Sequence, residues 1–376
     1  MKKKQQQYGQ YFTENNQVND IVNIIKKHAD LSGECLEPSF GDGAFIDVFK
    51  DYNLNIDAYE IDTEIFKDKF NLINVNLFNK DFIYNEITKK YNFIVGNPPY
   101  IELTYSFYDK EQQKELSKLY KASCDGRMNL THIFIYKCLE LLEEDGILAF
   151  LVPSSILTSP YYNKIRSLIH ENCNILHIKN DVNFKNVAIK VSLIIIQKTK
   201  NVTEDFILKY GKNIYFSENV IGFPKQIISL KDEGFKVGIG EVVWNQHKEK
   251  LTNENDIGTK TLVYSTHIGK DKLEITDIKN QEKKKYIVWE NIKHTNCILM
   301  PRTISKKLKF YYLKNNTEYA FENHVLVITN EDRSKLDNLY LKLKNEDFEK
   351  YIGLYFNSSN LSAEEVLNLP YKEIYE

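Results

Sequence analysis

The chain has 376 residues, of which 42% are hydrophobic, so it is long enough for two domains, or one large one, around a buried core. Its formal net charge is only −2, which lacks the basic bias common among nucleic-acid-binding proteins, and no apolar run approaches the roughly eighteen residues of a membrane-spanning helix. The five cysteines are scattered without a Cys-x-x-Cys pair, so the sequence predicts a reducing, cytoplasmic environment and neither a disulfide framework nor a metal site.

A loop with two glycines joins the first predicted strand to the helix that follows it. The segment Leu36–Ile46 begins as a short apolar strand that ends in the acid Glu37, and it ends as the start of an amphipathic helix. Gly41 and Gly43 allow the backbone to turn sharply and to approach a ligand closely, because neither has a Cβ atom. The pair does not match the G-x-G-x-x-G dinucleotide fingerprint, so by itself it predicts only a close backbone approach.

Two further acids follow at the ends of predicted strands. The segment Ile56–Asp62 is typical of a second strand, and Glu60 lies about twenty residues beyond the loop, where such folds carry a ribose-binding carboxylate. In Asn79–Phe82, Asp81 stands beside Phe82, a pair suited to hold a purine. A single acid at a strand end can instead cap the next helix, so that alternative stays open.

The most informative feature of the chain is a buried strand followed by two prolines. The apolar run Tyr91–Gly96 is typical of a parallel strand covered on both faces, and Asn97, Pro98, Pro99 and Tyr100 follow it directly. The prolines fix two φ angles and remove two backbone donors, at the edge where open α/β sheets bind ligands. An asparagine amide and a tyrosine ring suit a planar base with an exocyclic amino group. The alternative is a rigid turn without a catalytic role.

Strands and helices are predicted to alternate up to about residue 200, and the pattern of predicted elements then changes. Asn129–Leu157 has the pattern of a helix and then a strand, and Val191–Gln197, rich in β-branched residues, is expected to be the last strand of the sheet. A polar linker follows. Beyond it, short β-like runs such as Gly240–Asn245 and Asn323–Ile328 alternate with turns, and Asn330–Asn345 has the spacing of an amphipathic helix.

Together these motifs resemble the S-adenosylmethionine-dependent DNA adenine-N6 methyltransferases of the gamma class, over roughly residues 8–200. In that class the cofactor motifs precede the catalytic motif, and a target-recognition domain comes last. Residues 8–13, Tyr-Gly-Gln-Tyr-Phe-Thr, are similar to the family's Tyr-Phe-Thr motif, although Glu14 stands where the family usually has proline. The glycine loop is similar to the family's Asp-Pro-x-x-Gly-x-Gly, with Glu37 in place of the aspartate.

The resemblance implies S-adenosyl-L-methionine as the cofactor. Its methionine part would face Thr13 and Glu37. The contacts to the rest of the cofactor, including the ribose and the adenine, would come from Gly41, Gly43, Glu60, Asp81 and Phe82.

The resemblance also implies a catalytic set around the proline motif, namely Asn97, Pro98, Pro99 and Tyr100. Asn97 Oδ1 and the Pro98 carbonyl would accept hydrogen bonds from the amino group of the target adenine. The adenine would be flipped out of the duplex and bound by Tyr100 and by Phe184, the aromatic residue that the family places before the last strand.

The second half of the chain has an uneven charge distribution. Residues 281–314 carry nine Lys or Arg against two acids, with several aromatic residues among them, whereas residues 315–376 carry twelve acids against six bases. Basic side chains neutralise phosphates, and arginine is the commonest specific reader of guanine. We therefore expect DNA contacts from Trp244, Arg302, Lys306 and Lys307. A solvated lysine-rich surface is the alternative explanation.

The sequence thus predicts an α/β fold, a Rossmann-like seven-stranded methyltransferase sheet with a C-terminal mixed α+β target-recognition domain. Residues 1–205 are expected to form the S-adenosylmethionine-binding catalytic domain, and residues 206–376 the DNA target-recognition domain. The predicted activity is site-specific methylation of adenine N6 in double-stranded DNA by a monomer. This would protect host DNA from a cognate restriction endonuclease acting on the same site; whether such a partner exists is left open.

Two other interpretations compete with this one. A protein glutamine methyltransferase or an RNA methyltransferase uses the same Asn-Pro-Pro-Tyr motif, but the glutamine enzymes resemble a helical N-terminal domain plus a catalytic domain and end near where this sheet ends. A non-catalytic DNA-binding module is the second, and the intact glycine loop and proline motif argue against it.

Overall fold

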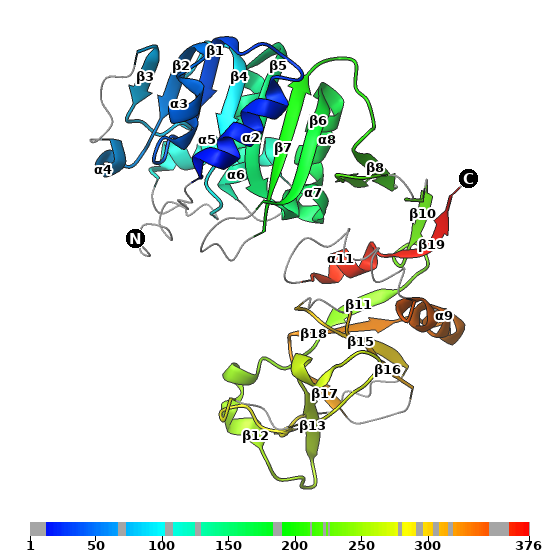
Figure 1. Cartoon of the computed structure of the whole chain (residues 1–376). Coiled ribbons are helices and arrows are strands. Elements are labelled where there is room, and N and C mark those ends of the chain that lie inside the picture. Colours follow the sequence, from blue (N-terminus) through cyan, green and yellow to red (C-terminus); the bar gives the residue numbers. More distant parts are fainter. Residues whose placement is uncertain are drawn as a thin grey trace. The chain divides into compact units, whose positions relative to one another are not determined.

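The chain divides into two compact units, Met1–Gly222 and Phe223–Glu376 (Figure 1). Among the described residues, no helix is both long and apolar enough to cross a membrane. The structure is a computed structural model that describes residues 13–66, 73–101, 108–124, 129–182, 190–210, 213–220, 223–224, 226–276, 280–290, 296–303, 308–314, 319–345 and 361–375.

The first unit is built on a seven-stranded sheet in the order β3-β2-β1-β4-β5-β7-β6 (Figure 1). Strands β1 to β5 run parallel to one another, whereas β7 is antiparallel to both of its neighbours, β5 and β6. The predicted Rossmann-like seven-stranded sheet is therefore confirmed. Its strands are β1 Ser32–Glu37, β2 Asn53–Tyr59, β3 Val75–Phe78, β4 Tyr91–Gly96, β5 Leu142–Pro153, β6 Cys173–Val182 and β7 Val191–Lys198.

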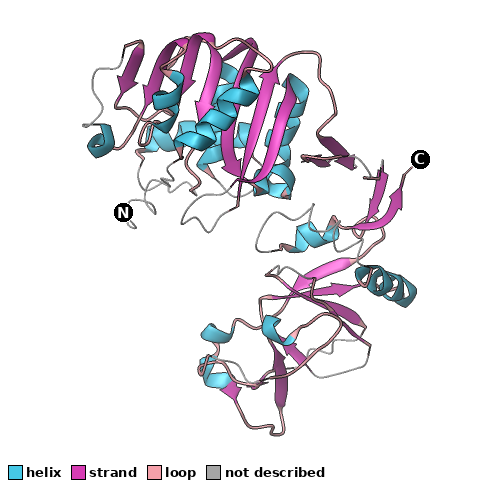
Figure 2. Cartoon of the chain, viewed as in Figure 1, coloured by secondary structure: helices cyan, strands magenta, loops and turns pink. Residues whose placement is uncertain are grey.

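Helices cover both faces of this sheet (Figure 2). Phe93 and Val95 of β4 pack into the core that contains α2 and α3, whereas Ile94 between them packs into the core that contains α6 and α8. Burial on both faces explains why the central strands are continuous apolar runs without polar alternation. The helices are α2 Asn15–Ile25, α3 Ala44–Phe49, α4 Thr63–Phe66, α5 Lys110–Ser123, α6 Leu130–Leu141, α7 Ser155–Thr158 and α8 Asn163–Asn172, with a 3-10 turn, η2, at Pro160–Tyr162.

A hairpin of β8 (Ile207–Tyr210) and β9 (Asn213–Phe216) extends the first unit beyond the expected boundary at residue 205. Ile207 and Phe216 belong to the same apolar core as α6 and α8. Because this packing attaches the hairpin to the large sheet, the division between the units falls after Gly222.

As far as the structure describes it, the second unit consists of small sheets with the orders β10-β19, β11-β18-β15-β16 and β12-β14-β13-β17. The β13–β17 pair is parallel and the other described strand pairs of these sheets are antiparallel. Its strands are β10 Gln226–Ser229, β11 Lys236–Ile239, β12 Leu251–Thr252, β13 Thr259–Val263, β14 Tyr286–Val288, β15 Cys297–Pro301, β16 Tyr311–Leu313, β17 Tyr319–Phe321, β18 Val325–Thr329 and β19 Pro370–Ile374. Its helical segments are α9 Arg333–Leu343, α11 Ala363–Leu367, and the 3-10 turns η3 Trp244–Gln246, η4 Lys248–Lys250 and η5 Ser265–His267.

One strand-like run of the second unit was predicted wrongly. Gly240–Asn245 runs from the end of β11 into the turn η3, and within the described part Val242 forms only an isolated bridge with Glu322. A Cβ atom on Gly240 would lie 2.2 Å from the carbonyl oxygen of Glu322. Gly240 N donates to the Val325 carbonyl at 2.8 Å and Val242 N to the Phe321 carbonyl at 2.9 Å, so the segment binds its neighbour without forming a regular strand. The other two expectations agree with the structure, since β18 and α9 lie where a strand and an amphipathic helix were predicted.

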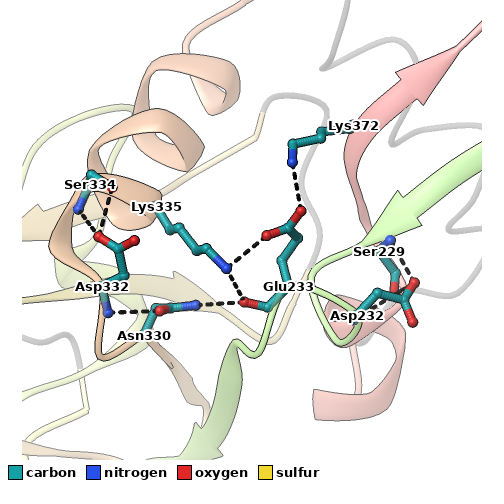
Figure 3. Close-up of polar contacts among 8 residues, drawn as sticks. All are labelled: Ser229, Asp232, Glu233, Asn330, Asp332, Ser334, Lys335 and Lys372. Carbon is teal, nitrogen blue, oxygen red and sulfur yellow. Dashed lines mark hydrogen bonds and ion pairs between the residues drawn. The ribbon is translucent and has the colours of Figure 1, made fainter.

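A charged network joins three segments of the second unit that are distant in sequence (Figure 3). Glu233, in the turn after β10, pairs with Lys335 of α9 through Oε2 and with Lys372 of β19 through Oε1, each at 2.7 Å. The Glu233 carbonyl also accepts hydrogen bonds from Lys335 at 2.9 Å and from Asn330 Nδ2 at 3.2 Å. The two lysines hold the pKa of Glu233 below its usual value.

Candidate active site

The acids and the asparagine singled out in the sequence lie at the carboxyl ends of four neighbouring strands. Glu37 ends β1, Glu60 follows β2, Asp81 follows β3 after a short turn, and Asn97 follows β4. The order β3-β2-β1-β4 puts these parallel strands side by side, so their ends meet at one edge of the sheet (Figure 1). Open α/β sheets bind ligands at such an edge.

The loop after β1 depends on its two glycines. Gly41 and Gly43 have φ angles of +55° and +88°, a left-handed conformation that glycine adopts without steric cost. Within the loop, Phe40 N donates to the Tyr59 carbonyl of β2 at 2.8 Å, and Gly43 N donates to the Phe40 carbonyl at 3.0 Å. The loop is therefore folded tightly against the end of the neighbouring strand.

Glu60 supports this loop directly. Its Oε2 accepts a hydrogen bond from Gly41 N at 2.8 Å, and its Oε1 accepts one from Asp62 N at 2.7 Å. Burial raises the pKa of Glu60, and the two backbone donors act against that shift. A ribose contact by Glu60, as expected from the sequence, would be made by a carboxylate that is already oriented by Gly41 and Asp62.

Glu37 is a buried acid with an unsatisfied oxygen. The residue is 1% exposed, and among the described residues its Oε2 has no hydrogen-bond partner. Burial, together with the nearby acids Asp42 and Glu60, raises the pKa of Glu37 well above its usual value. A cation bound beside Glu37 would satisfy the oxygen and reverse the shift. The ammonium group of S-adenosylmethionine is such a cation, so the residues present fit this cofactor.

The turn after β3 carries Asp81 and Phe82. Asp81 Oδ1 accepts a hydrogen bond from Ile83 N at 2.8 Å, which orients the carboxylate. Phe82 is 2% exposed and packs in the core, its ring centroid 5.7 Å from that of Tyr59 and 5.1 Å from that of Phe134. Phe82 thus supports the turn from the protein interior, and its place near the cofactor adenine stays a prediction.

The proline motif is anchored on both sides of Pro98. Asn97 Nδ2 donates to Thr13 Oγ1 at 3.3 Å, so the two sequence motifs that contain these residues meet in the structure. Ser39 Oγ donates to the Asn97 carbonyl at 3.1 Å, and Thr131 Oγ1 donates to the Pro99 carbonyl at 3.0 Å. The backbone of the motif is therefore held by the glycine loop and by α6.

The aromatic residues predicted to bind the target base are placed only in part. Tyr100 is 6% exposed and belongs to the apolar core on the α2 and α3 face. Phe184 lies outside the described residues, as do the first five residues of the motif at 8–13. The stacking role of both aromatic residues stays a prediction.

Ser39 and Thr131 are site residues that the sequence interpretation missed. Each donates a hydroxyl hydrogen bond to a backbone carbonyl of the proline motif, across 58 and 32 residues of sequence respectively. Thr131 carries one indirect signal, because Asn129 is the N-cap residue of α6 and its Oδ1 accepts from Thr131 N at 2.9 Å. The position of Ser39 inside the glycine loop is the corresponding signal for that residue.

In the second unit, Trp244 belongs to a surface on which lysines lie over indole rings. Lys248 Nζ and Lys283 Nζ lie 5.8 Å and 5.2 Å from the Trp244 ring centroid, and Lys250 Nζ lies 5.1 Å from that of Trp289. We call these five residues the indole–lysine face. Lys248 and Lys250 are exposed and both tryptophans are half-buried.

The other predicted DNA-binding residues do not join this face in the described structure. Arg302 is half-buried, and its Nε donates to the Leu361 carbonyl at 3.3 Å. Lys306 and Lys307 lie outside the described residues. Their role in DNA binding stays a prediction.

Comparison with known proteins gives relatives of one kind. The modification methylase CviBIII of Paramecium bursaria Chlorella virus NC1A is 28% identical over 348 residues, which cover 88% of this chain and 85% of that protein. The type II methyltransferase M.AccI of Acinetobacter calcoaceticus is 27% identical over 246 residues, or 62% of this chain, and the chain spans 45% of the length of M.AccI.

One solved structure is similar to this chain in fold, and part of the sequence matches a protein family. The type IIL restriction-modification enzyme MmeI, solved in complex with DNA, matches with a TM-score of 0.57 at 13% identity, over 94% of this chain and 64% of that chain. This likeness shows a shared fold. Residues 19–188 match the family described as Eco57I restriction-modification methylase, and this segment contains Glu37, Glu60, Asp81 and Asn97. The match to this family therefore covers the part of the chain that builds most of the candidate site.

Proposed function

We propose that this chain is a site-specific DNA methyltransferase that transfers a methyl group from S-adenosylmethionine to N6 of adenine. The observation that carries the proposal is the position of Asn97, which follows β4 at the same sheet edge as Glu37, Glu60 and Asp81. An amide suited to bind an amino group thus lies next to the loop suited to bind the cofactor. The relatives, modification methylases and type II methyltransferases, support a role in restriction-modification.

The cofactor would be held by the ends of three strands. The orphaned oxygen of Glu37 suits the cofactor's ammonium group, and the left-handed Gly41 and Gly43 keep side chains away from its path. Glu60 and Asp81, which follow β2 and β3, are the acceptors for the ribose hydroxyls and the adenine amino group. When bound, the cofactor supplies a methyl group on a sulfonium, which is already activated for transfer.

Asn97 would prepare the amino group of the target adenine. The N6 lone pair is delocalised into the ring, so N6 is a poor nucleophile until its hydrogens are drawn out of the base plane. Hydrogen bonds to Asn97 Oδ1 and to the Pro98 carbonyl would do this. The bond from Asn97 Nδ2 to Thr13 orients the amide, and Ser39 fixes the adjoining backbone. Catalysis would then rest on positioning and preorganised dipoles, without a strong base.

The target adenine has to leave the duplex, since its N6 is not reachable within the base stack. Tyr100, directly after the prolines, is the proposed stacking surface, and Phe184 is the proposed second one. Stacking of a base on an aromatic side chain contributes roughly 1–3 kcal/mol. This is comparable to the cost of unstacking one base, which is a few kcal/mol.

The second unit would bind the DNA, and the indole–lysine face is the described surface best suited to do so. Lys248 and Lys250 are exposed cations that can neutralise phosphates, although Lys248 would have to give up its 3.0 Å pair with Glu282. The half-buried rings of Trp244 and Trp289 lie beside them. Arg302, Lys306 and Lys307 remain proposed contacts. A cognate endonuclease that cuts the same site is the proposed partner in the cell.

Transfer of tritiated methyl groups to duplex DNA, followed by nucleoside analysis, tests the proposal. We expect the label in N6-methyladenine. Label in methylated cytosine would contradict the adenine assignment, and label in a protein or in RNA alone would favour the alternative methyltransferases, which the relatives found here do not favour.

A further inference from the structure

Lys137 of α6 binds the backbone of the turn that carries Asp81. Its Nζ donates to the carbonyls of Phe82, Ile83 and Asn85 at 2.7, 2.7 and 2.8 Å. The ammonium also lies 4.9 Å from the ring centroid of Phe82. An ammonium has three donors, so these three carbonyls use all of them. All the hydrogen bonds that the Lys137 ammonium can donate therefore go to the backbone of residues 82–85.

The turn depends on such support because it lies outside the hydrogen-bonded ladder of the sheet. It follows β3, the edge strand of the described sheet, and its residues take no part in the pairing of β3 with β2. Lys137 supplies the missing donors. The same residues present Ile83 N to Asp81 Oδ1 at 2.8 Å, so the backbone that Lys137 fixes is the backbone that orients the Asp81 carboxylate.

The charge of Lys137 acts on the same carboxylate. Burial raises the pKa of Asp81, and the Ile83 N–H and the Lys137 ammonium act against that shift. Burial in turn lowers the pKa of Lys137, and the charge of Asp81 acts against that change. Removal of the ammonium would therefore favour the neutral carboxyl, which is the weaker hydrogen-bond acceptor for an amino group.

The same helix also holds the catalytic motif. Thr131, near the start of α6, donates to the Pro99 carbonyl at 3.0 Å, and Leu130 N donates to the Ile101 carbonyl at 2.9 Å. α6 therefore contacts the Asp81 turn through Lys137 and the proline motif through its first turn. One rigid element spans the two loops that must bind the cofactor adenine and the target base.

We propose that Lys137 is a positioning residue for the cofactor, which holds Asp81 in the orientation that binds the adenine amino group of S-adenosylmethionine. The inference rests on the proposed function. Without the ammonium, the turn would adopt its binding conformation for only a fraction of the time, and the apparent affinity for the cofactor would fall by that fraction. The catalytic motif would keep its own anchors, Ser39 and Thr131.

The Lys137→Met variant tests this, because methionine fills similar space and donates no hydrogen bond. We expect the Kd for S-adenosylmethionine, measured by isothermal titration calorimetry, to rise about tenfold. The KM for the cofactor should rise in parallel, and kcat at saturating cofactor should change little. If Lys137→Met does not fold, Lys137→Gln, which offers two donors in place of three, is measured in the same way with the same expected direction.

Lys198→Met is the matched control. Lys198 Nζ donates to the carbonyls of Leu139 and Leu142 at 3.1 Å and 2.8 Å, so it also binds backbone carbonyls, but those at the C-terminal end of α6 and not those of the Asp81 turn. Its loss should lower the Tm and leave the cofactor Kd unchanged. A second control is Asp81→Asn. In the Asp81→Asn background, Lys137→Met should raise the Kd much less than it does in the wild type, because both changes remove the same cofactor contact.

The outcomes separate the inference from the function on which it rests. Wild-type protein that does not bind S-adenosylmethionine would overturn the proposed function. Wild-type protein that binds it, with Lys137 variants that bind equally well, would overturn the role of Lys137 alone. An equal loss of affinity in Lys198→Met would do the same, because it would reduce the effect to general stability.

Discussion

Around Asn97 the fixed geometry comes from neutral hydrogen bonds. Thr13 binds its amide nitrogen, Ser39 binds its carbonyl, and Thr131 binds the carbonyl of Pro99. Such bonds keep their strength over a wide range of pH, because none of these groups titrates near neutrality. The charged groups stand one or more strands away, where a cationic cofactor would need them.

Asn97→Ala should remove methyl transfer and spare cofactor binding. Loss of one preorganised hydrogen-bonding group at a reacting atom typically lowers kcat by about 100- to 1,000-fold. The Kd for S-adenosylmethionine should stay near that of the wild type, because the cofactor's proposed contacts are elsewhere. Single-turnover kinetics and calorimetry measure the two quantities. Near-normal turnover in this variant would rule out the role given to Asn97.

Ser39→Ala should weaken the placement of Asn97 without removing its amide. The lost bond is the 3.1 Å contact from Ser39 Oγ to the Asn97 carbonyl. Small displacements at a reacting centre cost up to about 100-fold in rate, so we expect kcat to fall by about ten- to 100-fold. Ser167→Ala, which removes a similar 3.1 Å hydroxyl–carbonyl bond within α8, is the control and should leave kcat unchanged. Equal rates in both variants would contradict the coupling between the two loops.

Among single residues, the sequence allows a prediction only for those that lie in short motifs. Asn97, Glu37 and the two glycines were predicted because the residues next to them in sequence belong to the same recognisable motif. Ser39, Thr131 and Lys137 were missed because each acts on backbone that is 32 to 58 residues away in sequence. Backbone carbonyls carry no residue identity, so a side chain that binds them leaves no pairing signal in one sequence.

At the scale of elements, apolar runs predicted the large sheet well and the second unit poorly. The runs at β4, β5 and β7 are buried on both faces, so their continuous apolar composition indicates buried strands. The strands of the second unit have 2 to 5 residues, which is too short for a period to show. At Gly240 the backbone lies too close to the Glu322 carbonyl to leave room for a side chain, and no periodicity encodes such a contact.

The charged network around Glu233 predicts an acid-sensitive contribution to stability. The folded pKa of Glu233 is depressed by Lys335 and Lys372, so its contribution to the free energy of unfolding is present above the unfolded pKa, about 4.3, and is lost as pH falls through the folded pKa. Glu233→Gln should lower the Tm at pH 7, and the difference from wild type should disappear in acid. Glu331→Gln is the control, since Glu331 is 93% exposed and 3.4 Å from Lys236. A Tm difference for Glu233→Gln that persists unchanged below pH 3 would contradict this account.

At the scale of the whole molecule, the two units divide the proposed work. The first contains the sheet edge with its acids and Asn97, and the second contains the indole–lysine face. The formal charge of −2 hides this division, because the basic residues 281–314 are followed by an acidic stretch. Composition of the entire chain is therefore a poor guide to its partner, whereas local charge is informative.

Removal of two exposed lysines should weaken DNA binding in a salt-dependent manner. The double variant Lys248→Ala and Lys250→Ala should raise the Kd for duplex DNA and reduce the slope of log K against log salt by up to about 2, since each phosphate contact contributes about 0.9. The control is Lys231→Ala with Lys236→Ala, two exposed lysines of the same unit that pair with a glutamate, as Lys248 does, but do not belong to the indole–lysine face. Fluorescence anisotropy at several salt concentrations measures both slopes. Identical slopes in the two double variants would remove the indole–lysine face from the DNA interface.

In the proposed mechanism, Asn97, at the edge of the sheet that would bind the cofactor, directs a methyl group onto adenine N6 in DNA. Sequencing that detects modified bases, applied to DNA from host cells that make either the wild-type protein or Asn97→Ala, tests it most directly. We expect N6-methyladenine at one adenine of a recurring short sequence with the wild type and its absence with the variant. Wild-type DNA without modified adenine, or the same modification in both, would contradict it.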